Sequence, residues 1–302
     1  MRPAAHLDVP YPHATAPRQA LDLFLPASAG PSSTLLVYIH GGAWRSESKD
    51  DFANTLMPTL VQHTNLPVAC LEYRLAPSDP HPAQVEDVVS GLSLLAGPLL
   101  PLEQGEAKWR RDGIVLIGHS AGAFMAASLI LDPPTSPPSP SFSVPRSVRL
   151  AVKGIICVDG IYDLPTLLDE YPSYASFIGE AFGADPVVLA HESPARWSAH
   201  GDERGRSVRI VVLHSRADEL LSLRQPRVFL RRLERVFGVG GASERVETGA
   251  AAAVDDEVGD ELERSLPSNV SCDFDSLTSG HYEVVKGEEL ARAVRALSPQ
   301  DW

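Results

Sequence analysis

The chain has few cysteines, no long apolar run and a shortage of basic residues. Its 302 residues contain only Cys70, Cys157 and Cys272, which are too few for a disulfide framework. Two of them lie in apolar, strand-like runs, so we expect buried free thiols and a reducing compartment. No C-x-x-C motif or Cys/His cluster occurs, and we therefore expect neither a metal nor another cofactor.

The lack of a long apolar run and the negative net charge argue against membranes and nucleic acid as partners. No stretch of about 18 apolar residues is present, so no membrane span is predicted. The first residues lack an apolar core and are broken by proline, which argues against a secretory signal or transit peptide and favours the cytoplasm. The formal net charge of −13 disfavours nucleic acid and anionic membranes as partners.

What remains is an ordinary globular composition, 44% hydrophobic and 22% charged, which suits a single domain over residues 1–302. Strand and helix patterns alternate, which predicts an α/β fold with a mostly parallel central sheet and helices on both faces. Strands are predicted at residues 21–25, 33–39, 68–73, 113–118, 154–158, 209–214 and 270–274. Helices are predicted at residues 50–62, 84–95, 121–131, 222–237 and 287–297.

Three segments interrupt this alternation. Residues from about 133 to 147 are rich in proline and serine and are expected to form a surface insert. Residues from about 238 to 265 are acidic and are expected to form a flexible loop, either a bland insert or a regulatory or docking element. Residues from about 162 to 200 are aromatic-rich and are expected to form an irregular cap over a pocket.

Two glycine motifs point to nucleophilic catalysis. GHSAG at 118–122 follows an apolar run and precedes a helix-forming run, as in a nucleophile elbow that exposes Ser120; the alternative is a glycine-rich turn with a bystander serine. HGGAW at 40–44 follows another predicted strand and is typical of a loop whose backbone N–H groups stabilise an oxyanion. Within it, His40 is expected to brace the loop, while Trp44 either forms a pocket wall or packs beneath the loop. Together the motifs predict a serine hydrolase of the α/β-hydrolase fold.

The chain order of this fold, serine then acid then histidine, locates the partners. Asp218 comes four residues after a predicted strand, where the acid is expected; the alternative is the N-cap of the next helix. Asp255 and Asp256 compete only by residue type, because they lie in the acidic insert. His281 follows the last predicted strand and is the best-placed histidine.

Taken together, several motifs resemble the fungal-type kynurenine formamidases, also called arylformamidases. The resemblance covers roughly residues 35–130, 154–180 and 208–297, and its motifs are HGGAW, EYRLAP, HPAQVEDV, GHSAG, GIYDL, DELL and GHYEVV. A tryptophan in fifth place of HGGxW distinguishes it from the HGGG of hormone-sensitive-lipase-type carboxylesterases. The resemblance implies hydrolysis of the small molecule N-formyl-L-kynurenine to L-kynurenine and formate, a step of tryptophan degradation toward NAD that needs no cofactor. It is also compatible with a homodimer.

Carried onto this sequence, the resemblance implies three catalytic residues and an oxyanion hole. Ser120 would be the nucleophile, Asp218 the acid and His281 the base. The N–H groups of Gly41, Gly42 and Ala121 would bind the oxyanion. The aromatic ring of the substrate needs an apolar wall, for which the candidates are Trp44, Tyr162 and Phe177.

Other functions compete with this one. A general carboxylesterase acting on short acyl esters would use the same triad, and a hydrolase-fold binding protein would use none. The residues that bind the amino-acid end of the substrate cannot be named from the sequence.

Overall fold

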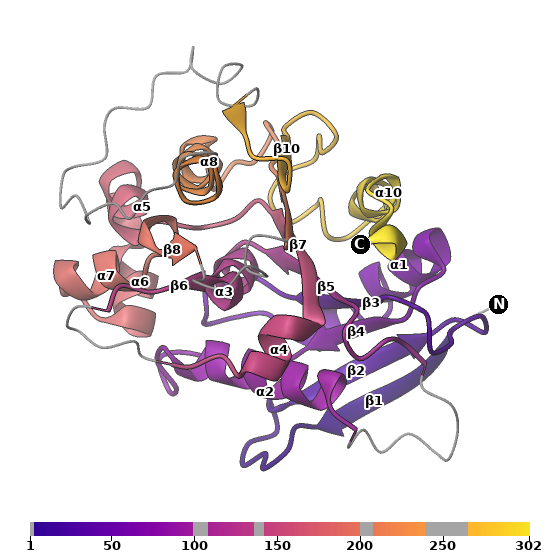
Figure 1. The fold of residues 1–302 in the computed structure, drawn as a ribbon. Helices are drawn as coiled ribbons and strands as arrows, with labels where there is room; N and C mark the ends of the chain where they lie inside the picture. Colours follow the sequence, from indigo (N-terminus) through magenta and orange to yellow (C-terminus); the bar gives the residue numbers. More distant parts are fainter. Residues whose placement is uncertain (1–2, 99–107, 136–141, 200–207, 239–264) are drawn as a thin grey trace.

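A central eight-stranded sheet organises the part of the chain that the computed structural model describes, which is residues 3–98, 108–135, 142–199, 208–238 and 265–302 (Figure 1). The strand order is β1-β2-β4-β3-β5-β7-β9-β10. β2 pairs antiparallel with both β1 and β4, and every later neighbour pairs in parallel. The strands of this sheet are β1 (Ala4–Pro10), β2 (Ala20–Leu25), β3 (Leu35–Ile39), β4 (Val68–Leu71), β5 (Ile114–His119), β7 (Val152–Val158), β9 (Arg209–Leu213) and β10 (Val270–Asp273).

Helices cover both faces of the sheet, as Figure 1 shows, and this confirms the predicted α/β-hydrolase class. A small ribbon of β6 (Leu131–Asp132) and β8 (Ser198–Ala199) lies apart from the sheet. The α-helices are α1 (Leu56–Thr64), α2 (Ala83–Ala96), α3 (Ala121–Ile130), α4 (Arg146–Ala151), α5 (Leu164–Glu170), α6 (Ala175–Phe182), α7 (Pro186–Glu192), α8 (Arg224–Phe237) and α10 (Glu288–Ala296). The 3-10 turns are η1 (Lys49–Asp51), η2 (Pro172–Tyr174), η3 (Pro194–Arg196) and η6 (Pro299–Asp301).

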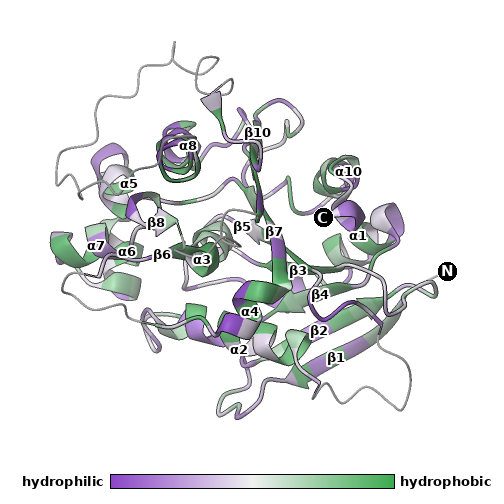
Figure 2. Cartoon of the chain, in the orientation of Figure 1, coloured by the Kyte–Doolittle hydropathy of each residue, from purple (hydrophilic) through white to green (hydrophobic). Residues whose placement is uncertain are grey.

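Two apolar cores lie on opposite sides of the sheet because successive side chains of a strand point to opposite faces. In β3, Leu35 and Val37 join the core that contains residues of α2, α3 and α8, whereas Leu36 and Tyr38 join the core that contains residues of α1 and α10. Strands covered on both faces have near-continuous apolar sequences. The central strands are accordingly green in Figure 2, and this continuity made them readable from the sequence.

The predicted strands and helices are confirmed to within a few residues except for the start of one helix, whereas β1, α4 and the two-residue strands β6 and β8 were not predicted. The helix predicted at 50–62 begins as η1, and its α-helical part starts only at Leu56. The antiparallel edge strand β1 was not predicted, because most of its side chains are exposed and it has no apolar run.

The segment predicted to be an irregular cap is mostly helical instead. It contains α5, α6 and α7, and the side chains of Asp163 and Asp185 cap the first turns of α5 and α7 by accepting backbone N–H bonds. Helices this short contain too few apolar repeats for a helical period to be detected in the sequence. The predicted inserts lie partly outside the described residues, which leave out 136–141 and 239–264.

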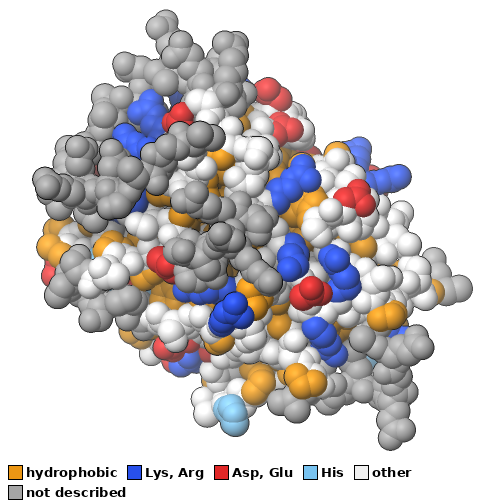
Figure 3. Space-filling model, in the orientation of Figure 1, with side chains coloured by type: hydrophobic (Ala, Val, Ile, Leu, Met, Phe, Trp, Pro, Cys, Tyr) orange, Lys and Arg blue, Asp and Glu red, His pale blue; other side chains and the backbone are white. Residues whose placement is uncertain are grey.

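The surface of the described residues mixes charges of both signs. On the face in Figure 3, Lys and Arg side chains lie among Asp and Glu side chains, and apolar side chains form separate areas. No helix in the described ranges is long and apolar enough to cross a membrane. Among the few large apolar side chains that are strongly exposed, Tyr282 stands out because it follows His281 in the chain.

Candidate active site

Ser120 occupies a sharp turn between β5 and α3. Its backbone has φ 54° and ψ −115°, a conformation that residues other than glycine rarely adopt. A Cβ atom at Gly118 would overlap the carbonyl of Gly122, and one at Gly122 would overlap the carbonyl of Ile39. The two glycines of the motif are therefore required by close backbone packing, and the strand–turn–helix context predicted for Ser120 is present.

The loop after β3 holds an equally unusual backbone. Gly42 has φ 85°, and a Cβ atom there would overlap the carbonyl oxygen of Ser46. Ala43 and Trp44, with φ 51° and 60°, also lie in the left-handed region. Three consecutive residues with positive φ turn the chain sharply beside Ser120, and Gly42 and Ser120 line the same cavity.

The three backbone N–H groups predicted to bind an oxyanion have different surroundings. Within the described residues, the N–H groups of Gly42 and Ala121 form no hydrogen bond, so both are available to a ligand. Burial raises the pKa of Glu47, and the backbone N–H of Gly41 is among the groups that oppose this shift. The Gly41 N–H thus faces a carboxylate, and Gly41 is absent from the described cavity lining.

Glu72, the residue after β4, fixes this loop from behind. One carboxylate oxygen accepts from Arg18 at 2.7 Å and lies 3.2 Å from His40 Nε2. The other accepts from the Ser48 hydroxyl at 2.6 Å and from the Lys49 N–H at 3.1 Å. Burial alone would raise the pKa of Glu72, but these partners, led by His40, lower it to about 2. His40 therefore braces the loop, as predicted.

Tyr73 adds a second anchor to the same loop. Its hydroxyl donates to the His40 carbonyl at 3.0 Å and lies 2.5 Å from the Gly41 carbonyl. Its ring stacks on the His40 ring with centroids 4.1 Å apart. A loop whose carbonyls are held on one side presents its N–H groups on the other, which suits anion binding.

Asp218 and His281 come together although 62 residues separate them in the chain. Nδ1 of His281 lies 2.8 Å from one carboxylate oxygen of Asp218, and both side chains are almost fully buried. The other oxygen accepts the N–H groups of Leu220 and Leu221. Asp218 thus stabilises a turn ahead of α8 as well as contacting His281. The N-cap of α8 is Leu223, so the alternative interpretation of Asp218 as the N-cap of the next helix is wrong.

The charge of Asp218 changes the basicity of the imidazole. Burial would lower the pKa of His281, but the hydrogen bond and negative charge of Asp218 outweigh burial and raise it. With Nδ1 bound to Asp218, Nε2 is the ring atom left for a substrate or a nucleophile. Among the described residues, the Ser120 hydroxyl forms no hydrogen bond with this ring. Catalytic hydrogen bonds are often long before a substrate binds.

Ser120 and His281 face one cavity of about 360 Å³, which is near the lower end of the range for small-molecule sites. Its lining is Gly42, Ala43, Arg45, Ser46, Ser120, Ile161, Ser173, Tyr174, Ser176, Phe177, Leu220, Leu221, His281 and Tyr282. A larger hollow of about 680 Å³ lies elsewhere, and none of the described residues that line it is ionisable. The smaller cavity, which Ser120 and His281 line, is therefore the candidate active site.

Of the three aromatic residues predicted to form the pocket wall, only Phe177 lines this cavity. Trp44 is fully buried and packs edge-on against Phe124 and Phe182, with centroids 5.2 and 4.9 Å away. Tyr162 is also fully buried and stacks on Phe229 at 4.2 Å. The expectation that these two side chains reach the cavity is therefore corrected, because each fills an apolar core. For Trp44 the alternative, packing beneath the loop, applies.

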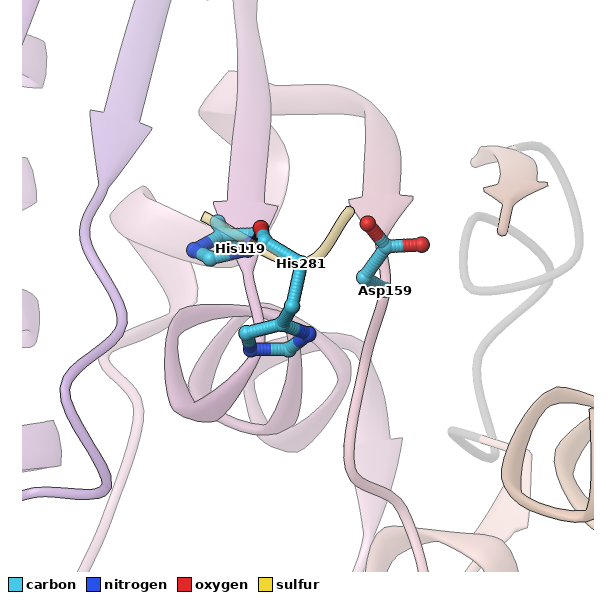
Figure 4. Close-up of side chains that lie close together, drawn as sticks. All are labelled: His119, Asp159 and His281. Carbon is cyan, nitrogen blue, oxygen red and sulfur yellow. Dashed lines mark hydrogen bonds between the residues drawn. The ribbon is translucent and has the colours of Figure 1, made fainter. Parts of the chain in front are cut away.

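A second buried carboxylate, Asp159, was missed in the sequence. It follows β7 directly, and its side chain accepts the Ser215 N–H at 2.7 Å. Burial and the charge of Asp218 raise its pKa to about 7. Its position was readable, since an acid just after a buried strand is the signal that located Asp218. Figure 4 shows His119 at the end of one strand and Asp159 just beyond the end of another, with the His281 ring nearby.

These groups also have the composition of a cation site. Ligand atoms of His119, Asp159 and His281 lie within 4.8 Å of one another, and so do those of Asp159, His214 and Asp218. Several of these atoms already have partners: His281 binds Asp218, and Nε2 of His119 contacts the His281 carbonyl at 2.9 Å. A cation at the cluster would compete with these contacts, so we expect the cluster to bind none.

Comparison with known proteins is consistent with this geometry. The BD-FAE family model matches residues 21–233. A protein named Kynurenine formamidase from Meyerozyma guilliermondii is 31% identical, with 78% of this chain and 89% of that protein covered. Another of that name, from Scheffersomyces stipitis, is 30% identical, covering 74% of this chain and 88% of the relative. A truncated carbohydrate esterase from gut microbiota has the same fold, with a TM-score of 0.71, 14% identity, and coverage of 100% and 98% of the two chains.

Proposed function

This chain belongs to the kynurenine formamidase family, and from that premise we propose that it hydrolyses N-formyl-L-kynurenine to L-kynurenine and formate. The observation that carries the proposal is the 2.8 Å contact between His281 and Asp218 at a cavity that Ser120 also lines. A nucleophile, a base and an orienting acid are the requirements for acyl transfer by covalent catalysis.

In the first half of the proposed reaction, the Ser120 hydroxyl attacks the formyl carbon while Nε2 of His281 takes its proton. Asp218 keeps Nδ1 protonated and stabilises the imidazolium, in line with the raised pKa of His281. The N–H groups of Gly42 and Ala121 receive the oxyanion, and losing one such donor typically costs about 3 kcal/mol of barrier. His281 then protonates the arylamine nitrogen as the C–N bond breaks.

In the second half, the formyl ester on Ser120 is hydrolysed. Water loses a proton to His281 and attacks the formyl carbon. His281 then returns this proton to Oγ of Ser120 as the ester bond breaks, which releases formate and restores the hydroxyl. The arylamine is a better leaving group than an alkylamine, because its lone pair delocalises into the ring. Since formyl is the smallest acyl group, a cavity of about 360 Å³ leaves most of its space to the aromatic part of the substrate.

The remaining assignments are proposals of the same kind. Every proton transfer above uses a side chain of the protein, so the reaction as written needs no cofactor. We place the enzyme in the cytoplasm, because two of its three free cysteines are buried as thiols. A homodimer is proposed from the family resemblance, and sedimentation velocity on the purified protein tests it.

The test is the kcat/KM of the purified protein on N-formyl-L-kynurenine beside p-nitrophenyl acetate, with Ser120→Ala as the control. We expect a strong preference for the formamide that the substitution abolishes. Fast ester cleavage with negligible formamide turnover would keep the triad but assign the chain to the carboxylesterases. Absence of both activities would instead support a binding protein.

A further inference from the structure

One charged pair stands at the cavity and takes no part in the chemistry proposed above. Arg45 follows Trp44 in the loop after β3 and lines the cavity, and one of its guanidinium nitrogens lies 3.2 Å from a carboxylate oxygen of Glu180. Both side chains are about two-fifths exposed, at 40% and 37%. Solvent therefore reaches the pair, and a ligand that enters from solvent can reach it too.

The pair adjoins the aromatic wall of the cavity. The Arg45 guanidinium carbon lies 5.5 Å from the centroid of the Phe177 ring, within the range of a cation–π contact. Phe177 and Glu180 lie three residues apart on α6, so they lie on the same side of that helix. The helix thus carries an aromatic ring and a carboxylate on its side toward Arg45.

Charge is otherwise scarce around this cavity. Among its described lining residues, Arg45 is the one Lys or Arg, and no Asp or Glu is present. The charge of Arg45 also extends to the neighbouring Tyr282, whose pKa is raised by burial while Arg45 opposes that rise. An anionic group that entered the cavity would therefore find one strong partner.

We propose that Arg45 and Glu180 bind the zwitterionic α-amino-acid group of the substrate, Arg45 taking the carboxylate and Glu180 the ammonium. The inference rests on the proposed function and extends it to the end of the substrate that does not react. The carboxylate and ammonium of an amino acid are attached to one carbon, so a neighbouring guanidinium and carboxylate offer the two opposite charges that complement them. A guanidinium donates two parallel hydrogen bonds to a carboxylate, a bidentate geometry that lysine cannot form.

This assignment gives the substrate one orientation. The formyl group lies at Ser120, the aromatic ring lies beside Phe177, and the amino-acid group lies at Arg45 and Glu180. An exposed ion pair contributes little to stability, so opening it for a ligand requires little free energy. The amino-acid group then contributes binding energy to the ground state and the transition state alike, which lowers KM.

The experiment compares two substrates that differ only in the amino-acid group, N-formyl-L-kynurenine and 2-formamidoacetophenone. We expect Arg45→Gln to lower kcat/KM on N-formyl-L-kynurenine by about 10- to 100-fold, mainly through KM. On 2-formamidoacetophenone, kcat/KM of the variant should stay within about twofold of wild type. Glu180→Gln should act in the same direction by about 3- to 10-fold, because it removes only the ammonium contact. Arg45→Lys keeps the charge without the fork and should fall between wild type and Arg45→Gln.

A matched control is Arg224→Gln, which removes another partly exposed ion pair, to Asp169, outside the described cavity lining. This substitution should leave kcat/KM unchanged on both substrates. If Arg45→Gln impairs both substrates equally, Arg45 serves the shape of the oxyanion loop and the inference is overturned; if it impairs neither, the inference also fails.

Failure of the proposed function gives a different result, because wild type would then turn over neither formamide. Binding of L-kynurenine to the Ser120→Ala protein, measured by calorimetry with and without Arg45→Gln, separates the two cases without catalysis. Weaker binding with the second substitution supports the subsite, and equal binding overturns it.

Discussion

Replacing Asp159 by asparagine is expected to change how the stability of the fold depends on pH. Asp159 is fully buried, and one of its carboxylate oxygens has no hydrogen-bond partner among the described residues. Burial, followed by the negative charge of Asp218, raises its pKa from the ordinary 3.8 to about 7. Asparagine has nearly the same shape and cannot titrate, so the substitution removes this proton equilibrium and little else.

The magnitude follows from the two pKa values. The unfolded chain releases the Asp159 proton near pH 3.8, whereas the folded protein holds it until about pH 7. Between these values the folded state binds one more proton, so the free energy of unfolding falls as pH rises, by up to about 1.4 kcal/mol per pH unit. The stabilisation is complete below the unfolded pKa and is lost through the folded one. From about pH 5 to about pH 8 the loss amounts to about 2.5 kcal/mol.

The assay is urea unfolding of wild type and Asp159→Asn, followed by tryptophan fluorescence at a series of pH values. The difference in free energy of unfolding between the two proteins should shift by about 2.5 kcal/mol across this range, in favour of the variant at high pH. The same substitution at the exposed Asp275 measures the effect of removing a surface charge. Parallel pH dependences for wild type and Asp159→Asn would refute the reasoning.

Three further predictions concern the site. Because Asp218 raises the pKa of His281, Asp218→Asn should move the acidic limb of the kcat/KM–pH profile to lower pH while kcat falls by roughly 10⁴-fold; an unmoved limb would contradict the pairing. Glu72→Gln should lower the free energy of unfolding by about 2 kcal/mol in urea titrations. It should also lower kcat by at least about tenfold with little change in KM, and an unchanged kcat would argue against Glu72 as the anchor of the oxyanion loop. Dialysis against EDTA should leave formamidase activity intact, with metal analysis of the same sample as the check; activity lost on dialysis and restored by zinc would reassign the His119 cluster.

The sequence predicted those parts of the fold and site that depend on local chain order. The parallel strands were readable because both faces are covered, which makes their sequences continuously apolar. Ser120 and Gly42 were readable because glycines at fixed spacing are needed for close backbone packing. Asp218 and His281 were readable because each follows a strand, and parallel strands end at one edge of the sheet.

Features that depend on packing between distant segments were not readable. Trp44 and Tyr162 were expected at the cavity, yet whether an aromatic side chain lines a pocket or fills a core depends on which neighbours surround it. For Trp44 these neighbours are Phe124 on α3 and Phe182 on α6, 80 and 138 positions away in the chain. The pair of Arg45 and Glu180 has the same character, since neither residue is notable until α6 folds over the loop.

The buried carboxylates around the site show where sequence position stops being informative. Glu72 directly follows β4 and Asp159 directly follows β7, so both occupy strand ends, yet neither was singled out from the sequence. Burial raises the pKa of each, yet the hydrogen bonds to Glu72 bring it down to about 2, whereas the neighbouring Asp218 takes Asp159 further up, to about 7. At neutral pH, Glu72 is therefore ionised and holds the loop after β3, while Asp159 divides between its two forms beside the His281–Asp218 pair. Two carboxylates at one kind of position thus differ in charge state, and only the partners brought in by the tertiary structure decide between the two states.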